Sequence, residues 1–211
     1  FAVTHFLVLK RVKTENRFHI STDQANDIST TIILGLIIGG RLGYVLFYNF
    51  SYYFKHPLEI ILPFQFDNGI TFTGITGMSF HGGLIGTLLG VWLYIRKSRL
   101  DFRDLTDLYA PVAPLGYTFG RIGNFINGEL YGRVTSLPIG MHFPLAPGNQ
   151  LRHPSQLYEA FFEGIFLFVV LWRLRKAKHP RGAMLAFYLM GYGAVRFCIE
   201  YARQPDSHMG F

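Results

Sequence analysis

A glycine-containing segment at residues 120–132, GRIGNFINGELYG, concentrates polar side chains that could bind a ligand. Its polar members are Arg121, Asn124, Asn127 and Glu129. Near the end of the chain, Arg196 and Glu200 are four residues apart, so both lie on one face of a helix. Two guanidinium groups that meet at one place favour an anion, and a phosphate group matches the geometry of their donors. The spacing therefore indicates an anion site, although Arg121 could instead pair with Glu129, and Arg196 with Glu200.

His81 is the residue that could act as a general base, because the pKa of histidine lies near neutrality. It could alternatively make a hydrogen bond at a helix end that supports close packing of Gly82 and Gly83. The sequence leaves both roles open. Neither an HExxH nor a CxxC motif occurs, so a metal hydrolase lacks its usual ligands.

The composition is typical of a membrane protein. Of the 211 residues, 50% are hydrophobic and only 16% are charged, whereas a soluble domain has about 25% charged residues. Candidate membrane spans cover residues 28–48, 77–95, 105–126, 155–172 and 183–202, and a shorter apolar run occupies residues 1–9. Buried helices of a soluble protein remain the alternative.

The net charge of +7 does not favour nucleic-acid binding, because the basic residues form short clusters between apolar runs.

The basic clusters alternate with connections that have few basic residues. The clusters are Lys10, Arg11, Lys13 and Arg17; Arg96, Lys97, Arg99 and Arg103; and Arg173, Arg175, Lys176, Lys178 and Arg181. The connections at residues 49–76 and 127–154 hold Lys55 alone and Arg133 with Arg152, respectively. This alternation follows the positive-inside rule, which predicts that the clusters are cytoplasmic and the two longer loops external.

We therefore predict an all-α, polytopic helical bundle in which residues 1–211 form a single transmembrane domain. It would have about five complete spans and a clipped one at residues 1–9, and we expect the first and last membrane helices to be missing from this chain. Charged groups within spans need a partner, and we expect Glu159 to pair with Arg41. The polar groups concentrate toward the external side, where the available phosphate is that of a lipid headgroup.

Five blocks of the sequence resemble the prolipoprotein diacylglyceryl transferase family, in the same order along the chain. The segment GRIGNFINGELYG is similar to the signature of that family. The supporting blocks are GGRLGYVLFYN at 39–49, GMSFHGGLIG at 77–86, RHPSQLYEA at 152–160 and GYGAVRFCIEYARQPD at 191–206. The resemblance covers almost the whole chain.

This resemblance implies a multi-pass enzyme of the bacterial inner membrane, with its site toward the periplasmic side of the bilayer. The family transfers the diacylglyceryl group from phosphatidylglycerol to the lipobox cysteine of a prolipoprotein signal peptide, forms a thioether and releases glycerol phosphate. The resemblance implies catalytic roles for His81, Arg121 and Arg196, and it implies no metal or cofactor. The substrate-binding residues that it implies are Arg121, Asn124, Glu129, Gly132, Tyr192, Arg196, Glu200 and Arg203. The family's functional tyrosine of the first membrane segment is expected to precede this chain.

A transporter or channel whose buried charges line a conduction path is the alternative from another class. Such a path would have charges throughout the membrane depth, whereas here they concentrate externally. A lipid-binding subunit without chemistry would use the same arginines but would not need His81.

Overall fold

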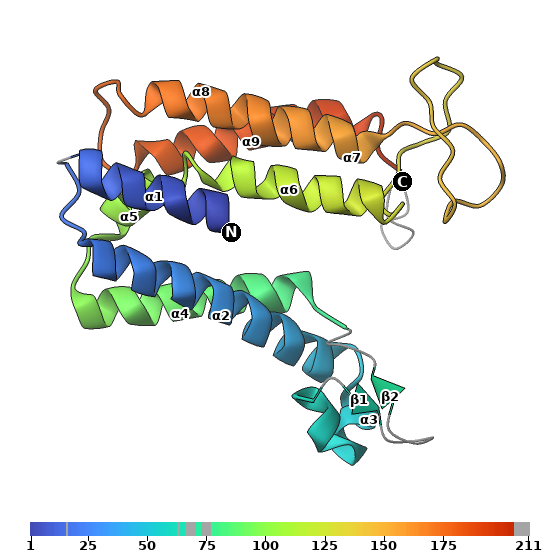
Figure 1. Cartoon of the computed structure of the whole chain (residues 1–211), viewed down its shortest axis with the longest axis horizontal. Helices are drawn as coiled ribbons and strands as arrows, with labels where there is room; N and C mark the ends of the chain where they lie inside the picture. Colours follow the sequence, from blue (N-terminus) through green and yellow to red (C-terminus); the bar gives the residue numbers. More distant parts are fainter. Residues whose placement is uncertain (16, 63, 66–70, 73–76, 205–211) are drawn as a thin grey trace. The chain divides into compact units, whose positions relative to one another are not determined.

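The computed structural model describes residues 1–15, 17–62, 64–65, 71–72 and 77–204 (Figure 1). Parts of the predicted external loop at 49–76, and the last two residues of the sequence block at 191–206, lie outside the described residues. The chain packs as two compact units, Phe1–His19 with Asp101–Phe211 and Ile20–Leu100. The assignment of residues 1–211 to one transmembrane domain stays a prediction.

The first unit consists of helices. These are α1 (Ala2–Thr14), α5 (Phe102–Tyr109), α6 (Ala113–Ile126), α7 (Ser155–Tyr158), a π-helical segment (Glu159–Phe166), α8 (Leu167–Leu174) and α9 (Ala183–Glu200). The segments from α7 to α8 follow one another without a break and form one continuous helix (Figure 1). Between α6 and α7, the chain forms an irregular head in which residues Val134 and Met141 both bridge to Arg152.

The second unit contains two long helices, α2 (Thr22–Phe47) and α4 (Phe80–Ser98). The other elements are α3 (Phe50–Lys55), a 3₁₀ turn (Pro57–Ile60), and the antiparallel strands β1 (Phe64–Gln65) and β2 (Thr71–Phe72). Ser21 begins α2 with a capping box, since its hydroxyl accepts from the amide of Gln24 and the Gln24 side chain accepts from the amide of Ser21. The described residues are thus predominantly helical, which confirms the all-α prediction.

The predicted span at 105–126 is wrong as a single helix. The structure has α5 and α6 there, separated at residues 110–112. Pro111 lies in this break, and Pro114 occupies the first turn of α6. Proline has no amide hydrogen and disrupts a helix interior, but it is tolerated in a first turn, so the helix ends and a new one begins.

Glycines let α2 and α4 pack with their backbones in contact. A Cβ atom on Gly39 would lie 2.4 Å from the carbonyl oxygen of Gly82, and one on Gly86 would lie 2.3 Å from that of Gly35. Such distances exclude any side chain unless the helices separate. Small residues at this spacing are typical of helix pairs in membranes.

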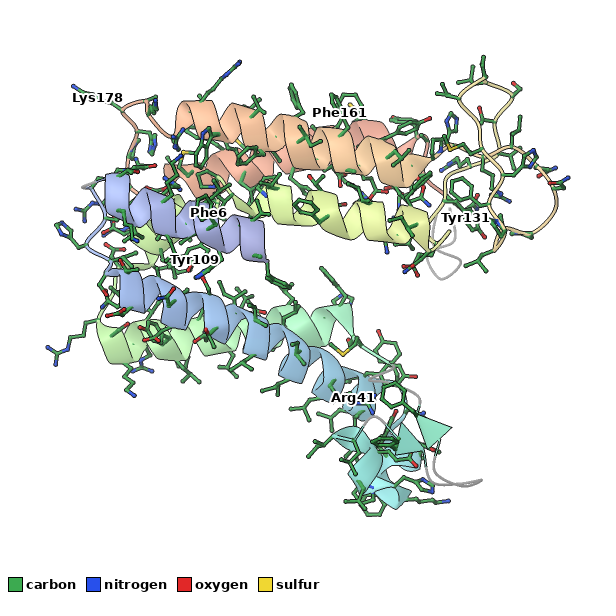
Figure 2. The ribbon with its side chains drawn as sticks, viewed as in Figure 1. Phe6, Arg41, Tyr109, Tyr131, Phe161 and Lys178 are labelled. Atoms are coloured by element: carbon green, nitrogen blue, oxygen red, sulfur yellow. The ribbon has the colours of Figure 1, made fainter. Side chains whose placement is uncertain are left out.

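Two helices among the described residues, α2 and α9, are long and apolar enough to cross a bilayer. Both expose large apolar side chains, including Leu34 and Ile38 on α2 and Leu189 and Met190 on α9. Phe161 likewise projects from the outer surface of the first unit (Figure 2). The small core of this unit contains Ala110, Leu167, Leu171 and Met184. Apolar exposure on this scale fits a protein whose solvent is lipid.

Candidate active site

A buried carboxylate, Glu159, is the centre of a charged cluster in the first unit. Its side chain is fully buried, and three arginines approach it. The Nε atom of Arg121 on α6 lies 2.8 Å from Oε2, and Nη1 of Arg196 on α9 lies 3.3 Å from the same oxygen. The Nε atom of Arg203, just beyond α9, lies 3.9 Å from Oε1. Residues from α6 and from the end of α9, which are distant in the sequence, therefore meet at the carboxylate of Glu159.

A second buried carboxylate, Glu163, extends the cluster. The hydroxyl of Tyr117 lies 2.9 Å from Oε2 of Glu159 and is also within hydrogen-bonding distance of Glu163. Arg196 lies 3.8 Å from Glu163 through Nη1 and Oε1. Because a phenol has only one hydrogen to donate, Tyr117 can satisfy one of these carboxyl groups at a time.

Close packing of two helices positions both carboxylates. Glu159 and Glu163 lie in the π-helical segment, where the wider helical turn changes the direction of successive side chains. Gly164 lets α6 approach this segment, since a Cβ atom there would lie 2.0 Å from the hydroxyl oxygen of Thr118. The hydroxyl of Thr118 in turn lies 3.3 Å from the carbonyl oxygen of Ala160. The carboxylates consequently face α6, which carries Arg121.

Arg121 is held in place but keeps donors for a ligand. Its guanidinium lies 4.8 Å from the centre of the Tyr117 ring, and its Nη1 donates to Asn124 at 3.3 Å. A guanidinium has five N–H donors, and the contacts of Arg121 with described residues involve only Nε and Nη1. The Arg121 side chain is 17% exposed, whereas that of Glu159 is 0% exposed. A buried carboxylate therefore orients the arginine, while part of the arginine side chain stays exposed.

Arg196 has the same arrangement and an additional exposed partner. Its side chain is 24% exposed, and its Nη2 lies 2.9 Å from Glu200, which is 44% exposed. The pairing of Arg196 with Glu200, which the sequence left open as the structural alternative, is therefore present. Arg203 lies 4.0 Å from the same carboxylate. Three arginines and three carboxylates, Glu159, Glu163 and Glu200, form the cluster, with two of the carboxylates buried beneath the guanidinium groups.

Glu129 contacts amides. It accepts hydrogen bonds from the side chains of Asn124 at 2.8 Å and Asn127 at 3.4 Å. The structural pairing that the sequence allowed between Arg121 and Glu129 is replaced by the ion pair of Arg121 with Glu159. Asn124 thereby links Glu129 to Arg121, so the polar residues of the 120–132 segment act as one group.

Gly132 and Tyr192 occupy supporting positions in the same unit. A Cβ atom on Gly132 would lie 2.4 Å from the carbonyl oxygen of Ala202, because this glycine pairs with Arg203 in a short antiparallel bridge. Only glycine fits there, and the bridge fixes the backbone that carries Arg203. The ring of Tyr192 lies edge-on to that of Tyr117, with centres 6.1 Å apart.

His81 belongs to the second unit. It lies in the first turn of α4, which is capped by Ser79, since the Ser79 hydroxyl accepts from the amide of Gly82. The His81 side chain is exposed, and its ring lies 5.7 Å from that of Phe80. The close packing of Gly82 against α2 was part of the structural alternative for this block, and that packing is present.

Sequence reasoning missed Tyr117 and the three arginines that approach Glu159 within its own unit, and the expected pairing of Glu159 with Arg41 stays a prediction. Arg41 belongs to the second unit, where its guanidinium donates to the carbonyl oxygen of Ile60 at 2.9 Å, and Glu159 has three arginines of its own unit. The spacing of Tyr117 and Arg121, four residues apart on one helix face, was a usable signal for the tyrosine. The pairing across helices had no signal in the sequence.

Comparison with known proteins assigns the chain to a family. The sequence model of the prolipoprotein diacylglyceryl transferase family matches residues 1–211. A phosphatidylglycerol–prolipoprotein diacylglyceryl transferase of Chlorobaculum tepidum is 51% identical over 100% of this chain and 73% of its own length. Proteins with the same name from Coxiella burnetii and Treponema denticola are 47% and 44% identical, again over 100% of this chain, and over 76% and 74% of their own lengths.

The similarity runs through every segment that contributes to the cluster, from α6 through the π-helical segment to Arg203. It also includes the block that contains His81. The family match covers the full chain, and the identities to the relatives are near 50%, so the family of this chain is established. This chain belongs to the prolipoprotein diacylglyceryl transferase family.

Proposed function

We propose that this chain transfers the diacylglyceryl group of phosphatidylglycerol to the lipobox cysteine thiol of prolipoproteins. The observation that carries the proposal is the pair of partly exposed arginines, Arg121 and Arg196, oriented from behind by buried Glu159. An arrangement of this kind suits a phosphate diester, whose oxygens accept from several guanidinium donors. The names of the relatives supply the substrates that such a site would act on.

The reaction forms a bond from sulfur to the glyceryl carbon and breaks the bond from that carbon to the phosphate ester oxygen. Glycerol phosphate leaves with the pair of electrons of the broken bond, and the thiol proton is transferred to a base or to the leaving phosphate. Arg121 and Arg196 would stabilise the charge that develops on the departing oxygens, which is the largest contribution that fixed donors make in such sites. They would also lower the pKa of the incoming thiol through their positive field.

The other residues of the predicted site have proposed roles in binding, positioning or proton transfer. Asn124 and Glu129 would bind the hydroxyl groups of the glycerol headgroup, since both present hydrogen-bonding groups beside Arg121. Arg203, Glu200 and Tyr192 would keep Arg196 and the phosphate in position. His81 would act as the general base or would position the thiol, and Gly132 would shape the wall of the site.

The proposed setting is the bacterial inner membrane, with several passes and the site toward the periplasmic leaflet. The positive-inside pattern of the sequence and the exposed apolar side chains of α2 and α9 support it. Family membership gives no support to the alternative of a transporter or channel.

Transfer is tested with the purified full chain in lipid nanodiscs, a lipobox peptide and radiolabelled phosphatidylglycerol. We expect thioether-linked diacylglyceryl peptide and glycerol phosphate in equal amounts.

Arg121→Ala should lower kcat by about 10²- to 10³-fold, the effect of removing one oxyanion donor. Arg121→Lys keeps the charge but loses the forked geometry, so it should restore activity only in part. Arg99→Ala, on an exposed turn of the second unit, is the control. A wild-type chain that yields neither product would contradict the proposal.

The two roles of His81 are separated by the pH dependence of His81→Asn. If His81 is the general base, wild-type kcat/KM rises with pH across the neutral range, and this rise disappears in the variant. If His81 positions the thiol, the variant has a lower kcat/KM but the same pH profile. A variant that matches the wild type across neutral pH excludes the general-base role.

A further inference from the structure

A second concave site of the first unit is basic and lies away from the arginine–carboxylate cluster. We call it the basic pocket; it is lined by Lys10, Thr14, Glu15, Arg17, Arg175, Lys176, Ala177, Lys178 and His179. Its volume is about 780 Å³, within the range of small-molecule sites. Arg175 is 16 residues beyond Glu159 along the continuous helix, so at about 1.5 Å per residue the two sites are roughly 24 Å apart.

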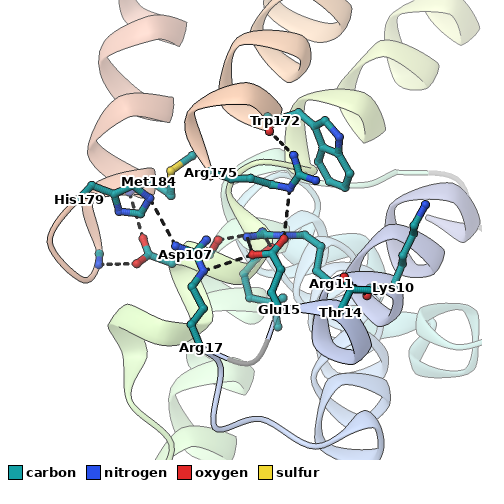
Figure 3. Close-up of polar contacts among 12 residues, drawn as sticks. Lys10, Arg11, Thr14, Glu15, Arg17, Asp107, Trp172, Arg175, His179 and Met184 are labelled. Atoms are coloured by element: carbon teal, nitrogen blue, oxygen red, sulfur yellow. Dashed lines mark hydrogen bonds and ion pairs between the residues drawn. The ribbon is translucent and has the colours of Figure 1, made fainter. Parts of the chain in front are cut away.

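Glu15 organises the arginines of the basic pocket (Figure 3). The Nε atom of Arg175 lies 3.2 Å from Oε1 of Glu15, and that of Arg17 lies 3.2 Å from Oε2. Arg11 contributes Nε at 2.8 Å and Nη2 at 3.0 Å to the same carboxylate. One carboxylate is thus shared by three guanidinium groups and cannot neutralise them.

Two of these arginines differ in what remains available to a ligand. Arg11 is buried, and its Nη1 donates to the carbonyl oxygens of Asp107 and Leu108, so it serves the structure. Arg175 stacks on Trp172, with its Cζ 3.7 Å from the ring centre, and borders the pocket. Stacking fixes the guanidinium of Arg175 before any ligand arrives, which lowers the entropy lost on binding.

The charge of the lining is strongly unbalanced. Five lysines and arginines and one carboxylate border the pocket, which leaves an excess of four positive charges when His179 is neutral. Lys10, Lys176 and Lys178 are exposed, and among the described residues none of the three has a carboxylate partner. Concentrated positive charge around a concave site attracts an anion, and fixed guanidinium donors favour phosphate.

We propose that the basic pocket binds the phosphate group of an anionic ligand, the headgroup of an anionic phospholipid being the first candidate. The choice of a lipid rests on the proposed membrane setting, in which these residues form a cytoplasmic cluster. Basic pockets between membrane helices on the cytoplasmic side bind anionic headgroups in this way. The pocket would anchor the cytoplasmic ends of α1 and α8 to the inner leaflet, at a distance from the reacting lipid.

The test uses the full chain in phosphatidylcholine nanodiscs that contain a photoactivatable phosphatidylserine, which is not the proposed substrate. Mass spectrometry of the labelled protein locates the adduct. The variant is Lys176→Gln with Lys178→Gln, and the matched control is Arg96→Gln with Lys97→Gln, which removes the same charge from the basic cluster of the other unit. Circular dichroism verifies the fold of both variants.

We expect adducts on residues 173–181 of the wild type and of the control. Each lysine near an anionic headgroup strengthens binding by about fivefold, so apparent affinity in the pocket variant should fall about 25-fold. Excess inorganic phosphate distinguishes the source of the ligand. Labelling that persists identifies the lipid headgroup. Phosphate binding by NMR titration that the pocket variant loses, without lipid labelling, assigns a soluble phosphate.

Equal labelling of the pocket variant and the control, or no binding of either probe at this segment, would overturn the proposal. The measurement does not depend on transfer activity, so it separates this proposal from the proposed function. Peptide lipidation by the pocket variant should remain at the wild-type rate, because the pocket residues are not in the arginine–carboxylate cluster.

Discussion

Glu159 has the most consequential position of any single residue in the arginine–carboxylate cluster. A buried carboxylate loses its hydration, and only well-placed partners offset that loss. Glu159 has Arg121, Arg196 and Tyr117 at 3.3 Å or less. Removing the charge of this one residue leaves two guanidinium groups without the carboxylate that orients them, although each keeps some other contact.

We therefore predict that Glu159→Gln destabilises the protein by about 3 to 5 kcal/mol, the usual effect of breaking a buried ion pair. Glutamine has nearly the same size as glutamate, so the decrease in the free energy of unfolding comes from the lost charge and not from altered packing. The measurement is the free energy of unfolding in mixed micelles. Glu200→Gln is the control, and its 44% exposed side chain predicts a change below about 1 kcal/mol. Equal effects of both substitutions would contradict the central role of Glu159.

We predict that the stability of the fold depends on pH through Glu15, which lies at the opposite end of the first unit. Burial raises the pKa of its carboxyl group, but the hydrogen bond from Arg11 and the charges of Arg11, Arg17 and Arg175 outweigh burial and lower it below the ordinary 4.5. A lowered pKa in the folded state stabilises the fold above the unfolded-state value, and this stabilisation is lost as the pH falls through the folded-state pKa.

Thermal unfolding at several pH values between about 3 and 7 checks this prediction. The wild type should lose stability below about pH 4.5, where an unfolded glutamate becomes protonated. Glu15→Gln should be less stable than the wild type at neutral pH, and the difference should shrink as the pH falls. A difference that does not change with pH would show that the Glu15 charge does not contribute.

At the scale of elements, backbone contact between α2 and α4 determines the second unit. Gly35 and Gly39 of α2 face Gly82 and Gly86 of α4, so each helix fills the space that a side chain would occupy on the other. Lipid gives little hydrophobic driving force between helices, and this close packing replaces it. His81 is beside one of these glycines, so the same contact fixes where its backbone lies.

Gly39→Ala should therefore destabilise the protein by about 1 to 3 kcal/mol, because the new methyl group meets the carbonyl oxygen of Gly82. Gly193→Ala is the matched control, since no atom lies within 4 Å of a Cβ there, and alanine favours a helix more than glycine. The apparent melting temperature should fall for Gly39→Ala and stay equal or rise for Gly193→Ala. A fall of the same size in both would exclude the contact as the cause.

At the scale of the whole molecule, charge and apolar exposure agree on a membrane setting. The apolar faces of α2 and α9 are exposed, and the basic residues collect at alternate connections. Reporter fusions test the proposed topology directly. Alkaline phosphatase fused after Leu58 or Gly140 should be active, and fluorescent protein fused after Arg99 or Lys178 should be bright. An inactive phosphatase after Leu58 or Gly140, or a dark fluorescent protein after Arg99 or Lys178, would contradict the alternation.

Much of the fold was predictable from the sequence because its signals are local. The predicted spans at 28–48, 77–95 and 183–202 correspond to α2, α4 and α9, since apolar composition persists along each helix. The span at 105–126 was predicted wrongly because hydropathy averages over Pro111, whose effect on the backbone is local. The π-helical turns within residues 155–174 could not be predicted either, because average hydropathy does not distinguish a π-helix from an α-helix.

The sequence by itself determined the helical class, the basic clusters and most of the polar residues of the candidate site, because each depends on residue type and on spacing along one helix. Only the tertiary structure decided which charges meet. It paired Glu159 with Arg121 and Arg196, added Tyr117, and showed that the backbone around Gly132 leaves no room for a side chain. Ion pairs between helices depend on packing distance and direction, and these arise only when distant segments of the chain come into contact.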